Sequence, residues 1–249
     1  MYGWRARIGY ISAGTGEVAG EELFKAAPDG VEVLHGNLFL REDNSTEFEH
    51  LCDSLEEMAK RLAEKAEVDV LVVAGYLLAA LACGKRAEDI SSLDRELIRS
   101  LEDLTKKPVI IGITAQMEAM QLFKIKHPLV IVPGSAENFP GLKEYLSGQG
   151  FEAFSIKGMD ISSYGDPYRV PLHVSFHFAK EAFLNTSGAD ALLFLESTFP
   201  SSPNILTLEQ DLGVPVFSDS LCCLWSCLRR MHISESLSGW GRLFEHKKH

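Results

Sequence analysis

Short apolar runs alternate with longer amphipathic or polar stretches along the whole chain. Eight of these runs have the length and composition of buried strands: Arg7–Ser12, Val31–His35, Val68–Gly75, Pro108–Ile113, Pro128–Pro133, Phe151–Ile156, Asp190–Leu195 and Val214–Ser218. Between them, apolar residues recur at helical spacing, as at Leu51, Leu55, Met58 and Leu62, at Leu142, Tyr145 and Leu146, and along Ile205–Leu212 before Gly213. The alternation predicts an α/β fold with parallel strands and helices on both faces.

An internal repeat divides the chain into two similar halves. Three pairs of corresponding strand positions are each 121 residues apart: Ile8 and Leu129, Val31 and Glu152, and Asp69 and Asp190. The repeat predicts two pseudo-symmetric Rossmann-like lobes, each a four-stranded parallel sheet flanked by helices, with a cleft between them. We expect residues 1–113 and 221–249 to form the first lobe and residues 114–220 the second. In this arrangement Gly75 lies opposite Glu196 across the cleft.

Composition limits the classes of function. The chain of 249 residues is 46% hydrophobic and 24% charged, the balance of an ordinary globular protein. A net charge of −11 without a basic stripe argues against nucleic acid as a partner. No apolar run approaches the roughly 18 residues that a membrane span needs, and the N-terminus enters a strand without a charged and apolar leader.

Cysteine usage indicates the redox environment. The five cysteines are odd in number and form no C-x-x-C pair. This pattern favours reduced thiols in a cytoplasmic protein and argues against a zinc ribbon. The sequence leaves the oligomeric state open, a homo-oligomer included.

A glycine-rich loop, Gly14-Thr15-Gly16-Glu17-Val18-Ala19-Gly20, follows the first strand. Such loops let a phosphate approach backbone N–H groups at a helix start. However, the spacing is G-x-G-x-x-x-G, and no acidic residue follows the second strand to hold a ribose. We therefore favour a loop that lines the pocket of a small anionic ligand, to which Thr15 donates a hydrogen bond, over a dinucleotide site.

Two further groups of residues have the spacing of a chemical site. His173 and His177 lie four residues apart on one helical face, but no acid or third ligand accompanies them, so an amphipathic helix is favoured over a metal site. Cys222, Cys223 and Cys227 lie in a helical segment, where they are expected to pack as small side chains. We predict no metal site.

Glu196 is the strongest candidate for chemistry. It ends the apolar run Ala191–Leu195, and Ser197 and Thr198 follow it. Ligands bind at the carboxyl ends of strands in open parallel sheets. Burial there would raise the pKa of a carboxyl toward the range useful for proton transfer. The alternatives are a cap on the following turn and an interlobe salt bridge.

The order of several segments resembles arylmalonate decarboxylase and maleate isomerase, within the aspartate/glutamate racemase superfamily. The similar segments are RIGYIS with its glycine loop, DVLVVAGYLL, ALLFLEST, LGVPVFSDS and the closing GWGRLF. The resemblance runs from Ile8 to Phe244. It implies two α/β lobes, an active site between them, no cofactor, and a small carboxylate substrate that reacts through an enolate-like or covalent intermediate.

The chain departs from the family where the family places its cysteines. The first cysteine position falls on Gly75, as in the decarboxylases, and the second falls on Glu196. Tyr76 and Leu77 stand where the decarboxylases have hydroxyls, and Ser135 replaces a tyrosine. The backbone of Ser197 and Thr198 would still stabilise an oxyanion, and Arg169 would pair with a substrate carboxylate.

Three hypotheses follow from these residues. The first is a cofactor-independent lyase or isomerase in which Glu196 is the acid and base at carbon. In it, the substrate and the enolate-like intermediate are bound by Tyr76, Thr15, Gly14, Gly75, Ser135, Ser197, Thr198 and Arg169. The second is a divergent family member that only binds a small carboxylate or carbonyl ligand. The third is an oxidoreductase that binds a nucleotide at the glycine loop.

Overall fold

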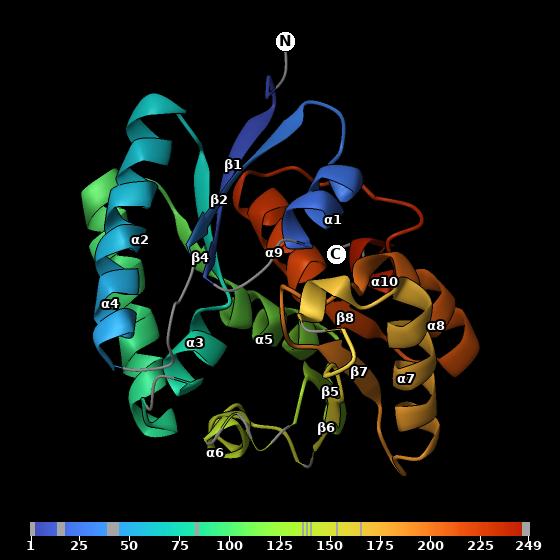
Figure 1. Ribbon diagram of the computed structural model, residues 1–249. Coiled ribbons are helices and arrows are strands. Elements are labelled where there is room, and N and C mark those ends of the chain that lie inside the picture. Colours follow the sequence, from blue (N-terminus) through green and yellow to red (C-terminus); the bar gives the residue numbers. More distant parts are fainter. Residues whose placement is uncertain are drawn as a thin grey trace.

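The computed structural model describes the chain except residues 1–2, 14–17, 39–44, 83–84, 136, 138, 140, 153, 165 and 246–249. It contains two four-stranded sheets with the strand orders β2-β1-β3-β4 and β6-β5-β7-β8. All the strand pairs are parallel. The predicted α/β fold with two similar parallel sheets is therefore confirmed, and Figure 1 shows one lobe above the other.

The elements of the first half are β1 (Ala6–Ala13), α1 (Ala19–Ala26), β2 (Val31–Leu38), α2 (Ser45–Lys65), β3 (Val70–Ala74), α3 (Tyr76–Ala82), α4 (Ala87–Thr105) and β4 (Val109–Ile111). Every residue of β3 and β4 is buried. This explains why these strands are continuous apolar runs without a polar face. Helices α2 and α4 lie on one side of the sheet, and α1 and α9 lie on the other.

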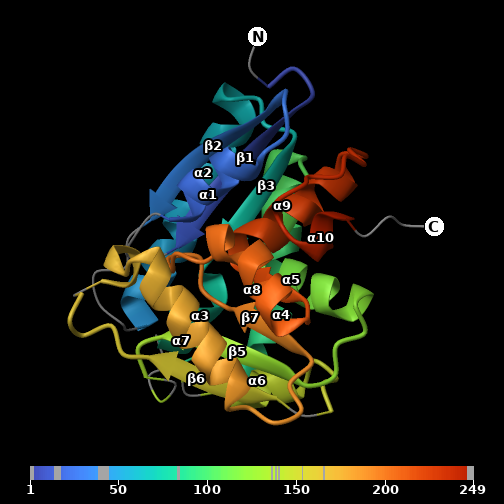
Figure 2. The same ribbon diagram turned by 90° about the vertical axis from the view of Figure 1, so that its right-hand side faces the viewer.

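The elements of the second half are α5 (Gly112–Leu122), β5 (Pro128–Pro133), α6 (Leu142–Ser147), β6 (Ser155–Met159), α7 (Leu172–Leu184), β7 (Ala191–Phe194), α8 (Ile205–Leu212), β8 (Val216–Ser218), α9 (Asp219–Arg230) and α10 (Arg242–Glu245). Two short 3-10 helices, Pro167–Arg169 and Ser202–Asn204, precede α7 and α8. Figure 2 shows α7 and α8 in front of the second sheet.

Helices α5 and α9 join the two lobes. They pack against each other, and each contacts strands of both sheets. Each helix follows its strand without a loop, because α5 begins at Gly112 after β4 and α9 begins at Asp219 after β8. The two helices are thus equivalent in the repeat, and they bring the carboxyl ends of β4 and β8 together between the lobes.

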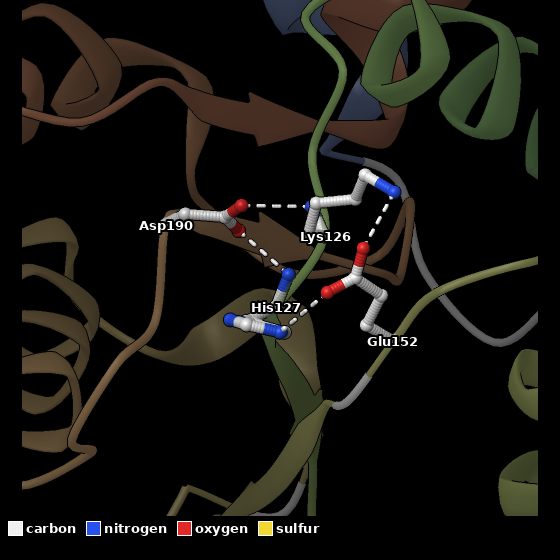
Figure 3. Close-up of polar contacts among 4 residues, drawn as sticks. All are labelled: Lys126, His127, Glu152 and Asp190. Carbon is white, nitrogen blue, oxygen red and sulfur yellow. Dashed lines mark hydrogen bonds and ion pairs between the residues drawn. The ribbon is translucent and has the colours of Figure 1, made fainter.

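Two aspartates perform the same task in the two halves, as the repeat predicts. The Asp69 carboxylate accepts the N–H of Arg7 at 2.8 Å. The Asp190 carboxylate accepts the N–H groups of Lys126 at 2.7 Å and His127 at 2.9 Å, and Figure 3 shows how it fastens β7 to the start of β5. Glu152 contacts the side chains of the same two residues.

The strand register shows where the repeat spacing differs from the prediction. Ile8 pairs with Val70 in the first sheet, whereas Leu129 pairs with Leu192 in the second. The structural counterpart of Leu129 is therefore Gly9, one residue after the predicted Ile8. The repeat holds, but one of its three predicted pairs is shifted by one residue.

Some predicted strand boundaries were wrong. Strand β2 continues beyond His35 to Leu38 because its pairing with β1 continues, and Gly36 leaves room for the Met58 side chain. Strand β6 begins at Ser155 instead of Phe151. It is an edge strand with partly exposed side chains, so its apolar pattern is weak. Strand β4 ends at Ile111, where α5 begins.

The C-terminal segment contacts both lobes. The Arg242 N–H donates to Glu209 of α8 at 2.8 Å, and the Arg5 guanidinium pairs with Glu235 at 2.5 Å. Gly241 has a φ of +89°, and a side chain there would collide with Ile205. This explains why the second glycine of the closing GWGRLF motif, Gly241, is a glycine. The assignment of residues 221–249 to the first lobe stays a prediction.

Candidate functional site

The carboxyl ends of four strands, β3 and β4 from one sheet and β7 and β8 from the other, meet at a small cavity between the lobes. It is lined by Gly75, Tyr76, Leu77, Ile113, Leu195, Glu196 and Asp219. Its volume is about 10 Å³, close to the space that one water molecule needs. The predicted apposition of Gly75 and Glu196 is therefore present in the structure, at the edge of the sheets where parallel α/β folds bind ligands.

The chain at Glu196 leaves the sheet directly after β7. The Leu195 N–H still donates to the carbonyl of Ile131 at 3.1 Å, so Glu196 projects from the end of the paired region. Its half-buried carboxylate accepts the Ser197 N–H at 2.9 Å, the Ser197 hydroxyl at 3.2 Å and the Thr198 N–H. The carboxyl group is thus fixed locally by the turn that follows it.

Gly75 and Tyr76 form the opposite wall of the cavity. Gly75 has a φ of +74°, which lets β3 turn directly into α3 and which a residue with a side chain would adopt only with strain. Tyr76 is the first residue of α3; its hydroxyl is hydrogen-bonded to the Cys52 thiol, and its ring packs on Phe48. Burial raises the pKa of Tyr76 well above its ordinary value. The phenol is therefore a neutral hydrogen-bonding group.

Asp219 is a second carboxyl group in the cavity, which sequence reasoning missed. It is 3% exposed. Its Oδ1 accepts a hydrogen bond from the Gln116 side-chain amide, and its Oδ2 accepts the Tyr10 hydroxyl at 3.3 Å and lies 3.9 Å from the Cys223 sulfur. Residues from β1, α5 and α9 thus hold this carboxylate from both lobes.

Gly112 is a glycine because the Asp219 carboxylate occupies the space where a side chain would lie. A Cβ atom at Gly112 would be 2.5 Å from Oδ1 of Asp219. We expect the methyl group of Gly112→Ala to displace the Asp219 carboxylate and break its hydrogen bond with Gln116. The free energy of unfolding, measured by urea denaturation, should fall by about 1–3 kcal/mol. Gly148→Ala is the control, since its Cβ would be 3.3 Å from the nearest atom. Equal stability of the two variants would contradict this packing.

Both carboxyl groups have raised pKa values. Burial and the neighbouring Asp219 carboxylate raise the pKa of Glu196 to about 7, although the hydrogen bonds from Ser197 and Thr198 lower it. Burial raises the pKa of Asp219 to about 7, and the charge of Glu22 adds to this. Groups that titrate near neutral pH at the carboxyl ends of strands are suited to proton transfer.

A pH dependence of stability follows from Glu196. Its pKa of about 7 in the folded protein exceeds the ordinary 4.5, so the protonated form is favoured by folding. The contribution is complete below pH 4.5 and is lost as the pH rises through 7. We expect Glu196→Gln to gain about 1–3 kcal/mol of unfolding free energy relative to wild type between pH 4.5 and pH 8.

Urea denaturation at the two pH values measures this change. Glu181→Gln is the control, because Glu181 is exposed. The difference in unfolding free energy between this variant and wild type should be the same at pH 4.5 and at pH 8. A Glu196→Gln difference that does not change with pH would contradict the raised pKa.

A buried network around Glu22 lies beside the cavity. The carboxylate of Glu22, on α1, accepts the N–H groups of Ser201 and Ser202, both at 2.9 Å, and the hydroxyls of Ser202 and Ser220. Glu22 is 4% exposed, and burial raises its pKa. The network connects α1 of the first lobe to α9 and to the loop that follows Glu196.

Other predicted site residues lie outside the cavity lining. Ser135 is exposed, and its hydroxyl accepts the Glu137 N–H at 3.2 Å. Arg169 is exposed and pairs with Asp166 at 3.4 Å. The N–H groups of Ser197 and Thr198 bind the Glu196 carboxylate. The roles proposed for these residues toward a substrate stay predictions. Gly14 and Thr15 lie outside the described residues, as do Gly16 and Glu17.

The two histidines and three cysteines singled out in the sequence lie on the helices α7 and α9. His173 and His177 are exposed on α7. Among the residues that the structure describes, no group of three or more His, Cys, Asp or Glu is placed to hold a metal ion. Cys222, Cys223 and Cys227 are fully buried in α9, which confirms that they pack in the core.

A signal for Asp219 was present in the sequence. The segments KPVIIG and VPVFSD end equivalent strands of the repeat, so Asp219 occupies the counterpart of Gly112. The strand-end rule that singled out Glu196 applies equally to this position. Glu22 had no comparable signal, because it follows Glu21 in a helix with a polar face.

A larger groove lies elsewhere, over α5, α9 and the segment before α10. Its volume is about 1110 Å³, and its lining includes Trp225, Arg229, His232 and Phe244. Neither Glu196 nor Asp219 lines it.

In the described part of the chain, no helix is long and apolar enough to span a membrane.

Comparison with known proteins gave one family match and several solved structures with a similar fold. The family model described as arylmalonate decarboxylase matches residues 11–244. The fold is similar to maleate isomerase Iso from Pseudomonas putida S16, at 20% identity and a TM-score of 0.79, over 96% of this chain and 98% of that one.

Two other solved structures are similar. One is arylmalonate decarboxylase, at 18% identity and a TM-score of 0.79 over 97% of this chain and 100% of that one. The other is a cysteine-to-serine mutant of Nocardia farcinica maleate cis-trans isomerase with a covalently bound succinylcysteine intermediate. It has 19% identity and a TM-score of 0.76, over 98% of this chain and 99% of that one. A search of curated proteins gave no match.

Proposed function

Because the chain belongs to the arylmalonate decarboxylase family, we propose that it is a cofactor-independent lyase or isomerase that acts on a small carboxylate. The observation that carries this proposal is the position of Glu196, at the carboxyl end of β7, opposite Gly75 and in a small cavity between the lobes. A carboxyl group with a pKa of about 7 both donates and accepts a proton near neutral pH. It would take the place that the family's cysteine holds.

In the lyase form of the reaction, Glu196 acts as the proton donor to carbon. The bond between the α-carbon and one carboxylate breaks, carbon dioxide leaves, and the electron pair remains as an enolate delocalised into the other carboxylate. The Glu196 O–H bond then breaks as the proton forms a C–H bond at the α-carbon. Solvent returns a proton to the Glu196 carboxylate, which completes the cycle.

In the isomerase form, the Glu196 carboxylate removes the α-proton and returns it after the intermediate has rearranged. Both forms require the carboxyl group to stand within about 3–3.5 Å of the reacting carbon. The apolar side chains of Leu77, Ile113 and Leu195 around the cavity support this chemistry, because they keep the pKa of Glu196 high.

The size of the cavity adds a conformational step. A volume of about 10 Å³ is far below the roughly 300 Å³ of a typical small-molecule site. Binding of a dicarboxylate therefore requires side chains or lobes around Glu196 to move apart. Closure around the bound acid would then exclude water from the reacting carbon.

The second candidate, a protein that binds such a ligand without turning it over, rests on one observation. The N–H groups of Ser197 and Thr198, which would stabilise an oxyanion, already bind the Glu196 carboxylate. A site in which these donors never become free would bind a carboxylate but would not stabilise an enolate.

Turnover in heavy water separates the two candidates. The protein is incubated in D₂O with malonate, substituted malonates and maleate, and proton NMR follows decarboxylation, isomerisation and exchange at carbon. We expect deuterium at the α-carbon of at least one acid. Thermal stabilisation by these acids with no change in any of them would overturn the enzyme proposal in favour of binding alone.

A further inference from the structure

Side chains from other elements hold Asp219 in place. The amide of Gln116 donates one hydrogen bond to Oδ1 of Asp219 and another, at 3.2 Å, to the carbonyl of Leu195. Gln116 is 1% exposed. One side chain thus connects the Asp219 carboxylate to the residue before Glu196 and fixes the two acids relative to each other.

Burial raises the pKa of Asp219, but its position in α9 and its hydrogen bonds stabilise the ionised form. It begins α9, a helix of 12 residues, whose N-terminal dipole stabilises a negative charge. It accepts hydrogen bonds from Gln116 and Tyr10. Gly112 leaves the space that its Oδ1 fills. Glu196 lines the cavity just after β7, is partly exposed, and accepts hydrogen bonds from Ser197 and Thr198.

No cation balances the two acids among the described residues. The titratable groups that face Asp219 are Tyr10 from β1, Glu22 from α1, Cys222 and Cys223 from its own helix, and Glu196 from the loop after β7. Those that face Glu196 are Asp219 and Tyr10. Each of these groups is neutral when protonated and negative when deprotonated, and none becomes a cation. If both carboxyl groups were ionised, these groups would supply no positive charge to offset their repulsion.

We infer that Asp219 is a positioning residue that keeps a proton on Glu196: the two carboxyl groups of the cavity hold one proton near neutral pH, with Asp219 as the anion. The consequence for catalysis rests on the proposed function of Glu196. When Glu196 gives its proton to the α-carbon, its O–H bond breaks and a second negative charge arises beside Asp219. The repulsion opposes a lasting charge on Glu196, so it favours the return of a proton from solvent and keeps Glu196 in the protonated form that can donate.

Carbon-13 NMR titration of labelled glutamate and aspartate carboxyl groups tests the pairing without a substrate. In wild type, we expect the Glu196 signal to titrate near pH 7. In Asp219→Asn, we expect its midpoint to fall by at least about 1 pH unit, because the neighbouring charge is gone. Asp94→Asn is the matched control, since it removes another buried acid outside the cavity, and it should leave the Glu196 midpoint unchanged.

The outcomes separate this inference from the proposed function. An unchanged Glu196 midpoint in Asp219→Asn would overturn the inference, whether or not the protein turns over an acid. A lowered midpoint in a protein without turnover would support the pair and reject the enzyme. With turnover, the pH above which proton donation declines should fall by the same amount in Asp219→Asn. Asp219→Ser serves as a second neutral variant if the asparagine variant does not fold.

Discussion

Glu196→Gln is expected to lower kcat by about 10²–10⁴-fold on any acid that wild type turns over, because general acid and base catalysis contributes this much. Glutamine has nearly the same shape and still accepts the N–H of Ser197, which binds the carboxylate at 2.9 Å. It neither gives nor takes a proton at carbon. The loss should therefore fall on kcat at every pH, with KM changed little. Initial rates measured by proton NMR between pH 5 and pH 9 provide the test.

Glu181→Gln is the matched control for the rate measurement. Glu181 is exposed on α7, so this variant should keep the wild-type rate. Thermal unfolding at pH 5 should give a similar midpoint for wild type and Glu196→Gln, which excludes a folding defect. A folded Glu196→Gln protein with near-normal kcat would remove Glu196 from the chemistry.

Glu22→Ala is expected to lower the free energy of unfolding by about 3–5 kcal/mol. The variant leaves the N–H groups of Ser201 and Ser202 and the hydroxyl of Ser220 buried without an acceptor. It also removes the connection between α1 and the loop that carries Glu196. For a protein of this size, such a loss lowers Tm by roughly 10 °C.

The neighbouring Glu21 provides a matched control for this prediction. Its side chain is 69% exposed and pairs with Lys25 one helical turn later. Glu21→Ala should therefore change the stability by no more than about 0.5 kcal/mol. Equal losses in the two variants, measured by urea denaturation at pH 7, would show that the network around Glu22 does not hold the lobes together.

The fold could be predicted from the sequence because strands buried on both faces leave a strong pattern. The apolar runs at Val70–Ala74 and Ala191–Phe194 mark the central strands, and the recurrence of Asp69 at Asp190 marks the repeat. Strand β6 was misplaced by four residues at its start because an edge strand alternates less clearly. The apposition of Gly75 and Glu196 followed from the repeat alone.

The rest of the site depends on contacts between lobes, which no local pattern encodes. Asp219 follows the end of a predicted strand, but its burial beside Glu196 does not show in the sequence. Glu22 has the pattern of a polar helix face. Both are buried only because α9 packs on α1 and α5. Tyr10 and Gln116 likewise become hydrogen-bond donors to Asp219 only when the lobes meet. Such residues can be found once the structure brings strand ends together.

A crystal structure with a bound dicarboxylate tests the central claim most directly. Glu196→Gln is soaked with the acid that wild type converts in D₂O, so that the bound molecule is not consumed. We expect density for the acid between Gly75 and the glutamine at position 196, with the α-carbon about 3–3.5 Å from the side-chain amide. Binding only in the groove beside Trp225 and Arg229, with the cavity between the lobes unchanged, would contradict it.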